Sequence, residues 1–115
     1  MQYLDLEHPS IRQSLSATAG SLKRARFVEV DVSAVNNPKR YGLTFEVFFE
    51  RDGAAPVRLG TFSLYPADNP GKFIVPASGK LTAPGSLIVS MIITDPVDPS
   101  APSPKVAVGK ISLVE

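Results

Sequence analysis

The sequence predicts an all-β protein, an antiparallel β-sandwich of about six to eight strands. Two observations support this prediction. Apolar and polar residues alternate in several short runs that are rich in β-branched residues. Most of the 11 prolines and 8 glycines lie between these runs, where such residues mark turns. No regular alternation of strands with helices is present, so a parallel sheet covered by helices is not expected.

The length and the charge of the chain limit the possible classes. A chain of 115 residues suits one domain with one modest core. We expect residues 1–115 to form this domain, with an irregular segment over residues 1–25 and the sandwich over residues 26–115. The net charge of +1 provides no field that would attract nucleic acid. No apolar run approaches the roughly 18 residues that span a bilayer, so a membrane is not expected as a partner either.

The N-terminal segment gives the weakest signals. Leu4 and Leu6 alternate with acidic residues and are expected to belong to a short first strand. Pro9 could begin a short helix that places Ile11 and Leu15 on one side. The Ser, Thr and Gly content of the same region fits a loop equally well. The first residues lack the basic and long apolar regions of a secretory signal, and the cellular compartment stays open.

Six runs from residue 27 onward are expected to be strands, and the first two have the period of two that is typical of half-buried strands. The run at residues 86–94 is almost continuously apolar and suits a buried strand instead. In the first run, Val28, Val30 and Val32 share a side that we expect to face the core. In the second run, Phe48 is the apolar exception on the polar side. Turn-forming residues separate the runs, including Asp52-Gly53, which is a hairpin signal. The six runs span residues 27–35, 43–50, 57–65, 72–76, 86–94 and 105–114.

Two of these runs change phase at a glycine, at Gly60 and again at Gly109. A strand that changes phase keeps one face buried only if one extra residue is inserted. A β-bulge inserts such a residue, and glycine supplies the positive φ that one type of bulge requires. We therefore predict bulges at Gly60 and Gly109. These bulges would let a sheet curl around the core or let a strand pass to the other sheet.

The inventory of reactive side chains argues against an enzyme. His8 is the only histidine, and the chain has no cysteine. One histidine cannot build a zinc or copper site of several nitrogen and sulfur ligands. A Ser-His-Asp machinery would depend on His8 alone. We expect no enzymatic activity and no cofactor, and we expect His8 to lie in a solvated loop.

Four polar residues of the predicted loops are weak candidates for ligand binding. Asp68 with Asn69, and Asp95 with Asp98, could supply oxygen ligands to Ca²⁺ if the loops gather at one end of the sandwich. Proline-rich turns also use Asp and Asn to bind backbone amides, and this structural role is the preferred interpretation.

Tyr41 and Phe48 are the aromatic residues that we expect to be most exposed. They are candidates for an anchor on a protein partner or a sugar. The basic run at residues 23–26 belongs to a chain that is nearly neutral as a whole, which argues against a nucleic-acid patch. It is expected to be the solvated entry to a strand.

Five stretches, in this order, resemble the C-terminal domain of plant polyphenol oxidases and related tyrosinases. The glycine in the middle of the last stretch is the most telling feature. The resemblance covers residues 26–115, and the first 25 residues have no recognised counterpart. The five stretches are RFVEVDVSAVN, YGLTFEVFFE, LGTFSLYP, LIVSMIITDP and KVAVGKISLV.

The resemblance implies a non-catalytic accessory β-sandwich. In that family the domain packs over the di-copper site of the preceding oxidase domain and shields it in the latent precursor. The expected partner is then a tyrosinase-type oxidase domain, which would itself supply the copper ligands. The residue that fills the copper site in the family has no recognisable counterpart here, so no site residue is transferred. Two alternatives stay open: a stand-alone structural module that self-associates, and a module that binds sugar or calcium through its loops.

Overall fold

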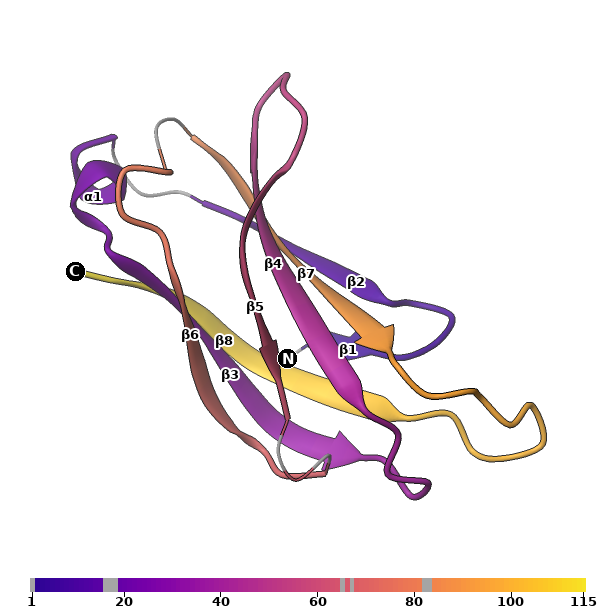
Figure 1. Ribbon diagram of the computed structural model, residues 1–115. Helices are drawn as coiled ribbons and strands as arrows, with labels where there is room; N and C mark the ends of the chain where they lie inside the picture. The colour runs from indigo at the N-terminus through magenta and orange to yellow at the C-terminus, as the bar shows by residue number, and fades with distance from the viewer. Residues whose placement is uncertain (1, 16–18, 65, 67, 82–83) are drawn as a thin grey trace.

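The computed structural model describes residues 2–15, 19–64, 66, 68–81 and 84–115 (Figure 1). The described residues form eight strands and one short helix, arranged as two four-stranded antiparallel sheets that pack against each other. The predicted β-sandwich is therefore confirmed. Sheet A has the order β1 (Gln2–Leu4), β8 (Lys105–Val114), β3 (Phe27–Asn36), β6 (Gly71–Pro76). Sheet B has the order β2 (Ser10–Ser14), β7 (Gly85–Ile93), β4 (Leu43–Arg51), β5 (Val57–Ser63).

The core lies between the sheets and is built from the predicted alternation. Every second residue of β4 is buried, from Leu43 to Phe49. Val28, Val30 and Val32 of β3 are buried as well, as the sequence predicts. Strands with one apolar face are stable only when that face is covered, and here each sheet covers the other. The largest fully buried side chains are Phe45, Leu4, Leu22, Leu43, Leu81 and Leu87.

A stack of three phenylalanine rings joins the two sheets at one edge. Phe62 of β5 lies between Phe45 of β4 and Phe73 of β6. The ring centroids are 5.0 Å apart for Phe45 and Phe62, and 4.6 Å apart for Phe62 and Phe73. Because β5 and β6 are the edge strands of different sheets, the stack fastens sheet B to sheet A where the sandwich would otherwise open.

The pairing register shifts beside Gly60. Val47 of β4 lies opposite Gly60, and Phe48 lies opposite Arg58, so Leu59 has no partner on β4. Leu59 is nonetheless buried. The extra residue is what allows both halves of β5 to direct apolar side chains into the core.

A second shift occurs beside Gly109, where Asp31 of β3 faces both Gly109 and Lys110. The predicted reason for the glycines is wrong, because neither Gly60 nor Gly109 has a positive φ. At Gly60 the reason is crowding instead, since a side chain there would press on Val75 of β6. Neither strand crosses between the sheets, as β5 stays in sheet B and β8 stays in sheet A.

The N-terminal segment is not irregular, which corrects the expectation for residues 1–25. Residues 10–14 form β2, which pairs with β7, so no helix begins at Pro9. Ile11 is the one buried residue of this strand. Leu6 is exposed, because the chain turns after β1 and the Asp5 amide bonds to the carbonyl of His8.

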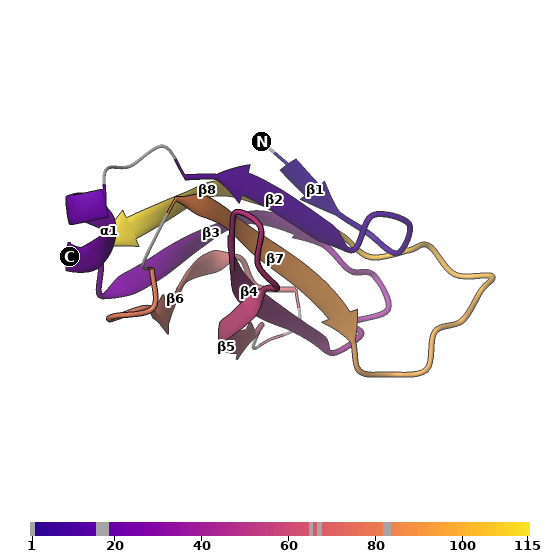
Figure 2. The ribbon, with the colours of Figure 1, turned by 90° about the horizontal axis from the view of Figure 1, so that it is seen from above.

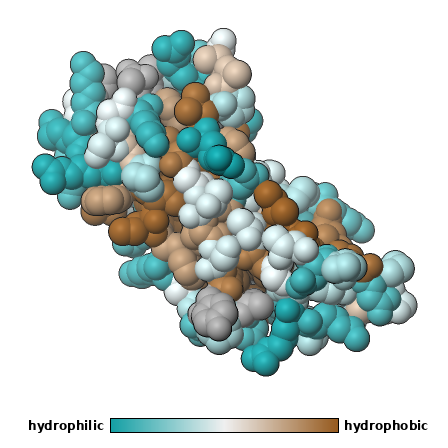
Figure 3. Space-filling model, in the orientation of Figure 1, coloured by the Kyte–Doolittle hydropathy of each residue, from teal (hydrophilic) through white to brown (hydrophobic). Residues whose placement is uncertain are grey.

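The short helix α1 (Ala19–Arg24) follows β2 and contributes Leu22 to the core. The molecule is elongated, with extents of 48 × 26 × 21 Å. Helix α1 and Glu115 lie at one end, and the connection between β7 and β8 projects from the other (Figures 1 and 2). In the view of Figure 3, hydrophobic side chains reach the surface in several separate groups among hydrophilic ones.

Candidate functional site

A long connection between β7 and β8 is the most conspicuous surface feature. Residues 94–104, here called the projecting loop, extend away from both sheets (Figures 1 and 2). The connection between β3 and β4, residues 37–42, lies at the same end of the sandwich. Hydrogen bonds between these two segments determine how the projecting loop leaves the sheet.

Three contacts fasten the base of the projecting loop. The Gly42 amide donates to Asp95 Oδ2 at 2.6 Å. The Thr94 amide donates to the Gly42 carbonyl at 3.0 Å, and the Thr94 hydroxyl donates to the same carbonyl at 3.2 Å. The loop therefore starts in a fixed direction.

Tyr41 provides the next contact and is not exposed, contrary to the expectation from sequence. Its side chain is buried, and its hydroxyl accepts a hydrogen bond from the Asp98 amide at 3.0 Å. Asn37, also buried, holds the Tyr41 backbone from both sides. Asn37 Nδ2 donates to the Tyr41 carbonyl at 2.9 Å, and Asn37 Oδ1 accepts from the Tyr41 amide at 3.1 Å. Tyr41 is thus a strut under the projecting loop.

The projecting loop also contains its own turn. Asp98 Oδ1 accepts from the Ser100 hydroxyl at 2.7 Å and from the Ser100 amide at 2.9 Å. These two bonds, the hydroxyl first, lower the pKa of Asp98 below the ordinary aspartate value. The prolines of the segment further restrict its backbone. Within this ordered loop, Val97 is 42% exposed.

The four predicted loop ligands serve separate structural contacts. Asp68 forms an ion pair with Arg40, with 3.3 Å between Nη2 and Oδ2. The Asn69 amide donates to the Pro66 carbonyl at 3.0 Å. Asp95 accepts a hydrogen bond from the Gly42 amide. Asp98 accepts one from the Ser100 amide, and its own amide donates to the Tyr41 hydroxyl. Among the residues that the structure describes, no group of three or more His, Cys, Asp or Glu side chains is arranged to hold a metal ion.

Phe48 lies on a different surface, the outer face of sheet B. It is half-buried and faces Ile88 of β7 on one side and Arg58 of β5 on the other. Arg58 pairs with Glu46 at 3.2 Å. A second ion pair on this face, between Arg12 and Glu50, lowers the pKa of Glu50 mainly through its hydrogen bond. Because Tyr41 is buried, it does not form one partner surface with Phe48.

Sequence reasoning did not single out several apolar residues that the structure exposes. Val97 lies in a loop, where no periodicity indicates exposure. Ile74 and Phe27 lie on the outer face of sheet A and are 57% and 37% exposed. The period of two did contain their signal, since each is followed by a buried valine on its strand.

His8 lies in an exposed turn, where its amide donates to Asp5 Oδ1 at 2.7 Å. Its Nδ1 lies 3.3 Å from the same oxygen. Within the described ranges, no helix has the length and apolar character that crossing a membrane would require. No family model matches this chain, and no curated protein or solved structure matches it either.

Proposed function

We propose that this chain is a non-catalytic accessory β-sandwich domain that acts by binding and covering a protein partner. The observation that supports the proposal is the projecting loop, which is held at its base by Gly42 and Tyr41 and displays Val97. A loop that is ordered before binding loses less conformational entropy when it docks. Such a loop can also block a cavity sterically, because the bonds of Asp95 and Asp98 hold its direction.

The resemblance of residues 26–115 to the C-terminal domain of polyphenol oxidases suggests the class of partner. We propose a tyrosinase-type di-copper oxidase domain, with the projecting loop entering the approach to its metal site. The chain then contributes volume and shape, and the oxidase contributes all the chemistry. Steric exclusion of the substrate is the whole mechanism that this chain needs.

The size of the contribution from Val97 follows from its exposure. Complete burial of a valine side chain is worth about 1.5–3 kcal/mol. Because Val97 is 42% exposed, docking can remove less than half of its surface from water. This corresponds to about 1 kcal/mol, or roughly a fivefold change in affinity. An aspartate at this position would cost more, since a buried charge loses its hydration.

The test uses a separately prepared tyrosinase-type oxidase domain, calorimetry and the rate of diphenol oxidation. The wild-type chain is expected to bind the oxidase and slow its turnover. Val97→Asp is expected to weaken binding at least about tenfold. Val57→Asp is the matched control, because Val57 is the exposed first residue of β5 and lies outside the projecting loop. Absence of binding, or equal weakening by both variants, would contradict the proposal.

A second candidate function is self-association through the outer face of sheet A. Phe27 lies opposite Pro76 on one side and Val114 on the other. Ile74 lies two residues before Pro76 on β6, opposite Glu29. These adjacent apolar side chains form an area that a second copy of the chain could cover. Ile74→Lys is expected to abolish any concentration-dependent increase in mass measured by light scattering. A wild-type mass that stays monomeric at high concentration would refute this candidate.

A further inference from the structure

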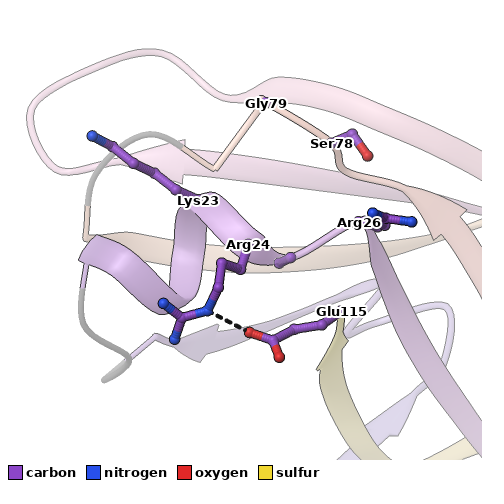
Figure 4. Close-up of a pocket in the computed structure, with 7 residues that line it drawn as sticks. Lys23, Arg24, Arg26, Ser78, Gly79 and Glu115 are labelled. Atoms are coloured by element: carbon purple, nitrogen blue, oxygen red, sulfur yellow. Dashed lines mark hydrogen bonds and ion pairs between the residues drawn. The ribbon is translucent and has the colours of Figure 1, made fainter.

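An open hollow of about 620 Å³ lies at the end of the sandwich that carries α1 and Glu115 (Figure 4). The projecting loop is at the opposite end (Figures 1 and 2). Three cationic side chains and one carboxylate line the hollow, together with Ser78 and Gly79 from the connection between β6 and β7. The charged residues are Lys23, Arg24, Arg26 and Glu115.

The backbone around the hollow is fixed by hydrogen bonds. The Arg26 amide donates to the Val114 carbonyl at 2.8 Å, and the Arg26 carbonyl accepts from the Ala77 amide at 2.8 Å. Arg26 is therefore held between the ends of β8 and β6. Opposite it, Gly79 has a φ of 71°, which suits the tight turn closed by the Lys80 amide and the Ala77 carbonyl. Both walls are thus ordered before any ligand arrives.

One carboxylate already occupies part of this hollow. Arg24 Nε donates to Glu115 Oε1 at 2.8 Å, and the two side chains turn toward each other (Figure 4). Both are more than half exposed, at 64% and 63%, so the pair is weak and open to competition from solvent ions and ligands. The pair is consistent with carboxylates as ligands of this hollow.

The remaining cations leave the hollow with a positive surplus. In the part of the chain that the structure describes, neither Lys23 nor Arg26 has a carboxylate within ion-pair distance. Arg26 and Ser78 lie on one side of the Arg24–Glu115 pair, whereas Lys23 extends away from them on the other side (Figure 4). Guanidinium and hydroxyl groups together suit carboxylate oxygens. A segment with several carboxylates would satisfy this surplus better than Glu115 alone.

We propose that the hollow binds an acidic segment of a protein partner, and that the Glu115 side chain competes with that segment for Arg24. Glu115 then acts as an intramolecular competitor. It lowers the affinity of the hollow for a single carboxylate more than for a segment that carries several. The interaction is electrostatic and exposed, so it weakens as the salt concentration rises. This inference concerns the end of the molecule away from the projecting loop and stands independently of the proposed function.

The test is a titration of the ¹⁵N-labelled chain with an N-acetylated hexaglutamate peptide, followed by amide chemical shifts. Shifts are expected at Arg24, Arg26, Ser78 and Gly79, and a hexaglutamine peptide should produce none. Arg26→Gln is expected to weaken binding about fivefold. Lys39→Gln removes an exposed cation from the connection between β3 and β4 and should leave the affinity unchanged. Loss of affinity in both variants would mean unspecific attraction and would overturn the proposal.

Glu115→Gln provides the sharper measurement because it removes the competitor. The affinity for hexaglutamate should rise about threefold. Glu7→Gln removes the same charge from the exposed connection between β1 and β2 and is the matched control, with no rise expected. Equal effects of the two variants would refute competition by Glu115. Tighter binding of inorganic phosphate than of the peptide at the same amides would instead identify a phosphate site and refute the assignment to carboxylates.

Discussion

Replacing Gly60 by alanine tests whether crowding determines the glycine at the register shift of β5. An alanine Cβ at this position would lie 3.1 Å from Val75 Cβ and 3.3 Å from Val75 Cγ1. Val75 is buried, and its Cβ is attached directly to the backbone of β6. Rotation of a side chain cannot relieve the contact, so β5 and β6 must move apart by a few tenths of an ångström.

Gly109 makes the comparison informative. An alanine Cβ there would overlap the Ser33 hydroxyl even more closely than the Cβ at position 60 would approach Val75. Ser33 is exposed, however, and its hydroxyl can rotate away at little cost. We therefore expect Gly60→Ala to be the more destabilising change, although Gly109→Ala has the shorter initial contact.

The magnitudes follow from two opposing effects. Overpacking of a core costs about 1–3 kcal/mol, and replacing glycine by alanine recovers about 0.4–1 kcal/mol by restricting the unfolded chain. Gly60→Ala should thus lower the free energy of unfolding by about 1–2 kcal/mol. For a domain of this size the melting temperature falls by roughly 4 °C per kcal/mol. Gly109→Ala should change the free energy of unfolding by less than about 0.5 kcal/mol, because rotation of Ser33 and the effect on the unfolded chain nearly cancel.

Urea unfolding followed by far-ultraviolet circular dichroism measures both variants on one scale. If the free energy of unfolding depends on the urea concentration with the same slope in both variants, their denatured states are comparable. The reasoning would be refuted if Gly109→Ala lost more stability than Gly60→Ala, or if Gly60→Ala were as stable as the wild-type chain.

Three further predictions concern the aromatic stack and the projecting loop. Phe62→Ala should lower the free energy of unfolding by about 3 kcal/mol. This value is at the lower end for a buried phenylalanine, because Phe62 is only half-buried. A loss below about 1 kcal/mol in urea unfolding would show that the stack does not join the sheets. Tyr41→Phe should lower the free energy of unfolding by about 1 kcal/mol or less and should speed hydrogen exchange of the Asp98 amide. Unchanged exchange would show that the Tyr41 hydroxyl does not support the projecting loop. The pKa of Asp98 is lowered in the folded chain, so its charged form stabilises the fold at pH values above the ordinary aspartate pKa of 3.8. This stabilisation is lost as the pH falls through the lowered pKa of the folded state. Asp98→Asn should therefore reduce the difference between urea midpoints at pH 7 and pH 3, and an unchanged difference would contradict a role for its bonds to Ser100.

Strands from Phe27 onward were predictable because each has an apolar face that must be buried. The period of two located β3, β4 and β8 to within about a residue or two of their observed ends. β2 was not predictable in the same way, because Ile11 is its only buried residue and one residue has no period. Its strand conformation follows from pairing with β7, which is a property of the tertiary structure.

The candidate site was less accessible to sequence reasoning than the fold. Tyr41 lies in a connection, and its burial results from the projecting loop, which is more than 50 residues away along the chain, as its bond to Asp98 shows. The basic run at residues 23–26 was visible in the sequence. Its placement around a hollow depends on Ser78 and Glu115, which come from distant segments. Contacts between loops have no local pattern, so only the folded structure reveals them.

The central position of β8 in sheet A determines the order in which the molecule can assemble during synthesis. β8 lies between β1 and β3, and Gln2 pairs with Val108. β1 can therefore take its place in sheet A only after β8 has been made, so the fold depends on contacts between residues far apart in the sequence, which are expected to slow folding. A nascent chain lacking Lys105–Val114 would expose unpaired edges on both β1 and β3, and such edges recruit other chains. Until β8 is made, the unpaired edges of β1 and β3 would have to be shielded from other chains.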